Sequence, residues 1–396
     1  MKKITGIICA LSLMFNAFAQ DPSYDDLTGG LNTITTAVPF LLIAPDSKAG
    51  AMGDVGVATT PDANSMHWNP AKLAFVDDDM GFSMSYVPWL RALVPDINLS
   101  YLAGYRKLND KEAIGLELRY FSLGDITFTD ILGTTIGQYK PSEFALGASY
   151  SRKLSDNFSL AISGRYIYSN LTGGQSANGI PTVAGQSIAA DIAGYYIKPI
   201  RLGGKDVDLA IGANISNIGN KISYTETPVQ DFIPINLRLG TSIGTEFDDY
   251  NKMSFAFDIN KLLVPTPAIY KAGSTGQDSD DILYGQDPNV AVVTGIFQSF
   301  GDAPGGFSEE MREINYSIGT EYWYANQFAI RAGYFFEHDT KGGRKFFTFG
   351  SGVKYNVFAL DFSYLINASS TINGNNPLAN TMRFTLVFDF GAMGES

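Results

Sequence analysis

The stretch RFTLVFDF, from Arg383 to Phe390, alternates between two kinds of side chain at every step. Successive side chains of a β-strand point to opposite faces, so this stretch forms one surface of three phenylalanines and a leucine. The opposite surface carries Arg383 and Asp389 among smaller residues. An aromatic surface backed by a partly charged one suits neither a soluble core nor a sandwich. The pattern is typical of a barrel strand with lipid outside and a polar lumen inside.

The same alternation recurs from Phe82 onward and predicts about fourteen antiparallel strands, an even number as in single-chain outer-membrane barrels. We therefore predict an all-β fold, a transmembrane outer-membrane β-barrel over residues 77–396. Its strands are expected to begin near Phe82, Ile97, Ala113, Phe144, Phe158, Ser187, Val207, Ile235, Met253, Ile314, Phe328, Phe346, Val357 and Met382.

Short connections alternate with long ones between these strands. The longest connection, residues 261–313, exceeds an ordinary structureless loop and so indicates either a function or mobility. Outer-membrane barrels place short turns in the periplasm and long loops outside the cell. This rule predicts that both termini are periplasmic and that the long loops are extracellular.

The N-terminus has the pattern of a secretory signal peptide. Two lysines precede an apolar run from Ile4 to Phe18, and small residues suited to a signal peptidase end at Ala19. Residues 1–19 are therefore predicted to be removed, so that the mature chain starts at Gln20. Because Cys9 leaves with the signal, the mature protein is expected to have no disulfide and no thiolate metal site.

Composition agrees with an outer-membrane protein. Hydrophobic residues make up 45% of the chain, yet after the signal no apolar run reaches the length of a transmembrane helix, so any membrane spans must be strands. The 21 tyrosines and 27 phenylalanines suit interfacial aromatic girdles. Loss of the two signal lysines changes the formal charge from −12 to −14, and this acidic balance argues against a nucleic-acid partner.

Residues 20–76 precede the first strand and are predicted to form a plug, or hatch, inside the lumen. Their most specific part is DSKAGAMGDVGVATTPDANSMHWNPAKLAF, residues 46–75, whose small side chains permit close approach to an enclosing wall. This stretch resembles the N-terminal hatch of the FadL-like outer-membrane proteins. The plug residues that we single out are Gly53, Asp54, Gly56, Asp62, Asn69 and Pro70.

Within that superfamily the chain is similar to the PorV family of the type IX secretion system of Bacteroidetes. Three stretches carry the resemblance: residues 47–75, YVPWLR from Tyr86 to Arg91, and DINKLLVPTP from Asp258 to Pro267. The resemblance implies a barrel that associates with the large translocon barrel and takes up cargo proteins by their C-terminal signal domains. It further implies delivery of the cargo to the surface attachment complex that contains the PorU sortase.

Two hydrophobic segments in the outer loops are candidate partner or cargo contacts. The first follows Pro88, and the second lies at the root of the long loop, where two prolines stiffen the chain. Large apolar side chains and arginine make good interface anchors, but such residues also form interfacial girdles or fold over the lumen mouth, and both alternatives stay open. The candidates are Trp89, Leu90, Leu93, Leu262, Leu263, Val264 and Pro265.

No constellation for catalysis, for metal binding or for a cofactor is evident. The only histidines are His67 and His338, and neither lies in a pattern with a nucleophile or with several metal ligands. The acidic run Asp278, Asp280 and Asp281 lacks the spacing of a calcium loop. We therefore expect no enzyme activity. The alternatives are a FadL-like channel for small hydrophobic molecules and, less favoured, a deacylase of outer-membrane lipid or lipopolysaccharide.

Overall fold

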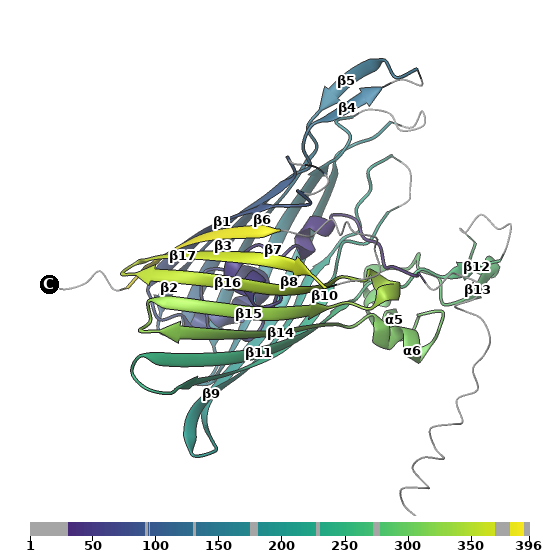
Figure 1. The fold of residues 1–396 in the computed structure, drawn as a ribbon. Helices are drawn as coiled ribbons and strands as arrows, with labels where there is room; N and C mark the ends of the chain where they lie inside the picture. Colours follow the sequence, from purple (N-terminus) through teal and green to yellow (C-terminus); the bar gives the residue numbers. More distant parts are fainter. Residues whose placement is uncertain are drawn as a thin grey trace, which may run out of the picture.

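The computed structural model shows a closed antiparallel β-barrel of fourteen strands (Figure 1). The structure describes residues 31–91, 94, 96–129, 132–174, 181–226, 230–271, 278–368 and 381–391. The barrel strands, in chain order, are β1 (Met80–Pro88), β2 (Asn98–Asn109), β3 (Glu112–Ser122), β6 (Ser142–Lys153), β7 (Phe158–Asn170), β8 (Gly185–Leu202), β9 (Lys205–Gly219), β10 (Asn236–Glu246), β11 (Asn251–Leu262), β14 (Asn315–Tyr324), β15 (Phe328–Phe336), β16 (Lys345–Tyr355), β17 (Phe358–Asn367) and β18 (Met382–Phe390).

The predicted fold class is confirmed, and all fourteen predicted strand starts lie within two residues of the observed ones. Each barrel strand pairs with the next along the chain, and β1 pairs with β18 to close the ring. On β1, Ser83 and Ser85 are buried, whereas Phe82 and Met84 are exposed on the outer face. Phe82 stacks on Phe388 of β18 with ring centroids 4.7 Å apart, so the seam is apolar on its lipid side.

The connections divide between the two ends of the barrel. Six short turns lie at one end, which we call the turn end, and seven connections that are mostly longer lie at the other, the loop end. The long loops carry elements of their own: β4 (Ile126–Thr129), β5 (Thr135–Tyr139), β12 (Ile269–Tyr270), η4 (Ser279–Asp281), β13 (Ile282–Tyr284), α5 (Val292–Gln298), α6 (Phe307–Arg312) and η5 (Asp339–Lys341). Among the described residues, no helix is long and apolar enough to cross a membrane.

The N-terminal residues 31–76, here called the lumenal segment, run inside the barrel, in purple in Figure 1. Four short helices form within it: η2 (Pro39–Leu42), α3 (Ser47–Ala51), α4 (Ser65–Trp68) and η3 (Pro70–Phe75). Helix α3 contacts β15, β16, β17 and β18, whereas η3 contacts β3, β6, β7 and β8. The lumenal segment therefore reaches walls on both sides of the barrel.

The described chain begins and ends at opposite ends of the barrel (Figure 1). At the loop end, the backbone amide of Asn32 donates to the Thr340 carbonyl, 3.0 Å away, in the connection between β15 and β16. At the turn end, Phe390 pairs with Met80 at the start of β1. The sequence predicted both termini on one side. Residues 1–30, which would place the N-terminus itself, lie outside the described residues.

Candidate binding site at the mouth of the lumen

Backbone contacts hold the lumenal segment against the wall. The Gly53 amide donates to Thr348 Oγ1 at 2.8 Å, and the amides of Gly56 and Val57 donate to the Asp258 carboxylate at 2.8 and 3.0 Å. Gly53 has a φ of +73°, and a Cβ atom there would lie 2.6 Å from the Tyr334 carbonyl oxygen. A side chain at this position would be strained and would also collide with β15.

The remaining predicted plug residues have distinct contacts inside the lumen. Asn69 caps η3 by accepting from the Ala71 amide, and its own amide group donates to the Gly194 carbonyl of β8 at 3.0 Å. Asp62 pairs with Lys48 at 3.0 Å, and Asp54 pairs with Arg383 of β18 at 3.1 Å. Pro70 is the first residue of η3, where its missing amide hydrogen costs nothing.

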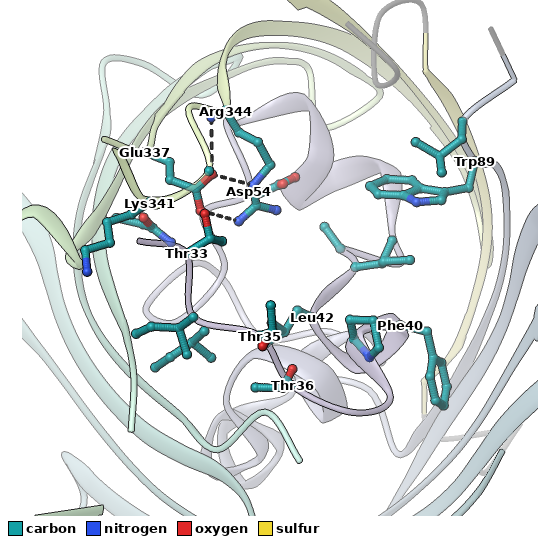
Figure 2. A pocket seen from close by; sticks show the side chains of 18 of the residues that line it. Thr33, Thr35, Thr36, Phe40, Leu42, Asp54, Trp89, Glu337, Lys341 and Arg344 are labelled. Atoms are coloured by element: carbon teal, nitrogen blue, oxygen red, sulfur yellow. Dashed lines mark hydrogen bonds and ion pairs between the residues drawn. The ribbon is translucent and has the colours of Figure 1, made fainter. Parts of the chain in front are cut away.

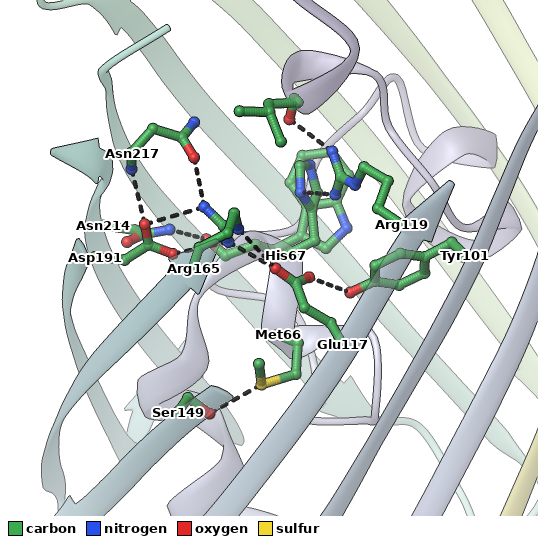
Figure 3. A network of polar contacts seen from close by, with 12 residues as sticks. Met66, His67, Tyr101, Glu117, Arg119, Ser149, Arg165, Asp191, Asn214 and Asn217 are labelled. Atoms are coloured by element: carbon green, nitrogen blue, oxygen red, sulfur yellow. Dashed lines mark hydrogen bonds and ion pairs between the residues drawn. The ribbon is translucent and has the colours of Figure 1, made fainter. Parts of the chain in front are cut away.

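A buried polar network joins the lumenal segment to the wall (Figure 3). Arg165 of β7 binds Glu117 of β3 at 2.7 Å and Asp191 of β8 at 3.0 Å. Beside it, an Arg119 guanidinium nitrogen lies 2.6 Å from Nδ1 of His67 in α4. Burial and the neighbouring arginine guanidinium groups hold the pKa of His67 well below its usual value. This neutral ring is therefore an acceptor in a structural network.

Above the lumenal segment, at the loop end, lies a cavity of about 550 Å³, here called the mouth cavity (Figure 2). Its volume is typical of a ligand site. Aromatic and aliphatic side chains form much of its wall, including Phe40, Trp89 and Phe346. The opposite side is polar, since Arg344 pairs with Glu337 at 2.8 Å and Lys341 lies beside them.

The predicted partner residues that the structure describes do not protrude from the loops. Trp89 and Leu90 are half-buried, line the mouth cavity, and pack against Phe346 and its neighbours. At the root of the long loop, Leu263 and Val264 are only 1% and 2% exposed. Pro265 is also buried and Leu262 lines the mouth cavity, whereas Leu93 lies outside the described residues. A partner role for these residues stays a prediction. In this conformation, a partner that approaches the loop end would meet other, more exposed side chains first.

Two short helices of the long loop carry exposed apolar side chains that the sequence analysis did not single out. Phe307 of α6 is 80% exposed and Phe297 of α5 is 73% exposed. We call the group the helical patch: Val293, Phe297, Phe300, Phe307 and Met311. The opposite face of α5 packs on the rim of the barrel through Val292 and Ile296. Apolar residues on both faces of a short loop helix, one face packed on the rim and the other exposed, were the available signal in the sequence.

Two buried lysines fasten α6 to the barrel rim. Lys261 Nζ lies 2.6 Å from Glu313 and 3.1 Å from Glu310, and Lys341 Nζ lies 2.9 Å from Glu313 and also pairs with Glu309. We call these five residues the rim clasp. The amide group of Asn32 donates to Glu309 as well, at 3.1 Å, so the rim clasp also ties the start of the lumenal segment to the long loop.

The remaining sequence candidates for chemistry lie apart from the mouth cavity. His338 accepts from the Thr340 amide at the start of η5, and Asp278 accepts from the Asp280 amide at the start of η4. Across the described ranges, no group of three or more histidine, cysteine, aspartate or glutamate side chains is placed to hold a metal ion.

This architecture defines the class of the protein, a fourteen-stranded outer-membrane β-barrel with its N-terminal segment packed against the inside of the wall. The model of one protein family, the type IX secretion system protein PorV, matches residues 28–269, more than half of the chain. The chain therefore belongs to the PorV family, and it is an outer-membrane component of the type IX secretion system. A search of curated proteins finds no match.

Several solved structures are similar to this chain at low sequence identity. The Pseudomonas putida toluene transporter TodX is 11% identical with a TM-score of 0.50, over 88% of this chain and 98% of its own. The Ralstonia pickettii toluene transporter TbuX is 12% identical with a TM-score of 0.46, over 87% of this chain and 98% of its own. A Pseudomonas aeruginosa FadL homologue is 12% identical with a TM-score of 0.40, over 91% of this chain and all of its own. At such identities the likeness concerns the fold alone.

Proposed function

We propose that this barrel binds the C-terminal signal domain of cargo proteins as they emerge from the translocon barrel and passes them to the sortase-containing attachment complex. The observation that carries this proposal is the mouth cavity, a site with aromatic and charged walls at the loop end of a PorV-family barrel. The step is one of binding and release, and we assign no covalent chemistry to the chain. His67, buried between arginines, is unsuited to act as a base.

We propose that the lumenal segment closes the barrel to solutes. Support comes from its packing against strands on both sides of the lumen and from the buried network around Arg165. We also propose that the turn end faces the periplasm and the loop end faces the cell surface, as in other outer-membrane barrels. The mouth cavity then opens where cargo is attached.

A second candidate function is uptake of small hydrophobic molecules. The apolar part of the mouth cavity, with Phe40, Trp89 and Phe346, favours it. The two functions predict different losses when the gene is deleted. Loss of cargo secretion with normal uptake of long-chain or aromatic compounds supports the adaptor. Intact secretion with abolished uptake contradicts the adaptor and supports the channel.

A pull-down with an isolated cargo C-terminal domain tests the proposal directly. The purified barrel should retain this domain and should release it to the attachment complex. A matched control is the same cargo protein without its C-terminal domain, which should not be retained. Equal retention of both cargo forms, or of neither, contradicts the proposed function.

A further inference from the structure

The start of the lumenal segment is an extended chain whose backbone groups are largely unpaired among the described residues. From Leu31 to Thr36 the side chains alternate between exposed and half-buried, the period of an extended strand, although these residues belong to no helix or sheet. The chain is pinned at Asn32 by the Thr340 carbonyl and at Ala37 by the Phe232 carbonyl, at 3.0 and 2.9 Å. Between these pins, the backbone groups of residues 33–36 have no hydrogen-bond partner in the part of the chain that the structure describes.

This stretch forms one border of the mouth cavity. Thr33, Ile34, Thr35 and Thr36 all line the cavity, and Figure 2 shows the three threonines below the polar group around Arg344. A row of unpaired backbone N–H and C=O groups is a template for an added β-strand. A strand laid along it would direct every second side chain away from solvent.

The geometry points to an extended polypeptide segment as the ligand of the mouth cavity, paired with the backbone of Thr33 to Thr36 and with apolar side chains at alternate positions. This inference rests on the proposed function, because it names the part of the cargo that the cavity receives. Phe40 and Trp89 would contact the apolar side chains, while Arg344, Glu337 and Lys341 border the polar side. A hydrocarbon would use the apolar wall but would make no hydrogen bond to the backbone groups of residues 33–36, which only a polar ligand can pair with.

A synthetic peptide tests the inference. The probe is a fluorescent eight-residue peptide in which valine and threonine alternate, with both ends blocked, titrated into the purified full chain in detergent. We expect saturable binding. The same peptide with alternate backbone amides methylated keeps its side chains but cannot pair along one edge, and it should bind at least tenfold more weakly. Equal binding of the two peptides overturns the inference.

Variants of the chain provide the complementary measurement. Proline removes a backbone donor while tolerating an extended conformation, and neighbouring residues of a strand point their amides to opposite edges. One of the variants Thr35→Pro and Thr36→Pro should therefore lose about fivefold in peptide affinity, as expected for one hydrogen bond, and the other should not. The matched variants Thr35→Ala and Thr36→Ala retain the amide and should lose less affinity than the sensitive proline variant. Heat-modifiable migration in gels verifies folding of each variant.

The outcome also separates this inference from the proposed function. Leu42→Trp places a large side chain in the mouth cavity and should abolish peptide binding. If the cargo domain is still retained by Leu42→Trp, cargo binds elsewhere, so the inference fails while the proposed function stands. If oleate saturates the cavity and the peptide does not bind, the cavity is a small-molecule site and the inference fails.

Discussion

Gly333 of β15 lies directly against Met52 of the lumenal segment, so closely that a Cβ atom on Gly333 would overlap the Met52 carbonyl carbon. The lumenal segment and the barrel wall therefore pack so closely here that one added methyl group would not fit. Gly319 of β14 and Gly212 of β9 meet the segment in the same way, at Met52 and at Val57.

Adding a methyl group at Gly333 should displace the lumenal segment. In planar bilayers we expect the natural protein to be nonconducting, a variant lacking Ser47 to Phe75 to conduct steadily, and Gly333→Ala to show intermittent openings. Gly164→Ala is the matched control, because a Cβ atom there meets nothing within 4 Å. A large steady conductance of the natural protein would contradict the proposed closure.

Removing Arg165 should destabilise the barrel strongly. The variant Arg165→Ala leaves Glu117 and Asp191 buried and unpaired, a change that typically costs about 3–5 kcal/mol. The measurement is the urea midpoint of heat-modifiable folding. The control is Arg152→Ala, because Arg152 is exposed and its pair with Glu112 should contribute at most about 1 kcal/mol. Similar midpoints for the two variants would show that the buried network does not hold the fold.

Asp302 should make attachment of the long loop depend on pH. Burial and the nearby carboxylates of Glu310 and Glu313 raise the pKa of Asp302 to about 6, and its Oδ1 has no hydrogen-bond partner among the described residues. A carboxyl group with a raised pKa stabilises the folded state at low pH, and this contribution is lost as the pH rises from the ordinary aspartate pKa through 6. The attached state should therefore weaken over this range.

The variant Asp302→Asn should remove this dependence, since an amide oxygen can still accept from the Thr266 amide as the Asp302 carboxylate does. We expect this variant to resist chymotrypsin within residues 292–313 better than the natural protein at pH 8, and equally well at pH 4. The exposed Asp280→Asn variant should behave as the natural protein. A difference that is the same at both pH values would contradict the role of ionisation.

The helical patch should contribute more to partner binding than the segments around Trp89 and Leu263. Replacing Phe297 and Phe307 together by Ser should weaken co-purification with the translocon about thirtyfold or more, as for truncation of an interface anchor, without changing the urea midpoint. Leu263→Asp should instead lower the urea midpoint, because Leu263 is buried in the rim. Trp89→Ala should lower it less, because Trp89 is only half-buried. Normal co-purification of the double variant would exclude the helical patch as an anchor.

The barrel strands were predictable because lipid and lumen impose opposite demands on alternate residues. Phe384 and Arg383 show this directly, since the first is 43% exposed and the second 2%. Two adjacent phenylalanines gave no such guide, and in the structure Phe346 turns inward and Phe347 outward. The expectation that inward side chains are polar does not predict an inward phenylalanine. Phe346 points inward because it packs with Phe335 and Leu365, two residues that lie near it only once the chain has folded.

The candidate site was predictable only in part. Composition identified the small residues of the lumenal segment, but not the wall glycines that receive them, because Gly319 and Gly333 look like ordinary strand residues in the sequence. Burial of Leu263 and Val264 depends on distant partners, among them Ile235, whose carbonyl accepts from the Leu263 amide at 2.8 Å. The unpaired backbone of residues 33–36 leaves no trace in residue type, since threonine suits paired and unpaired strands alike.

The position of the lumenal segment also sets the order of assembly. This segment directly precedes β1, and β1 pairs with β18, the barrel strand farthest from it in the sequence. A segment that precedes every barrel strand is thus enclosed by a ring that β18, the final barrel strand in the sequence, closes. Contacts as tight as that between Met52 and Gly333 leave no clearance for threading afterwards. We therefore expect the lumenal segment to take its place before β1 pairs with β18. A peptide of residues 31–76 added to a closed barrel that lacks this segment should not bind inside it.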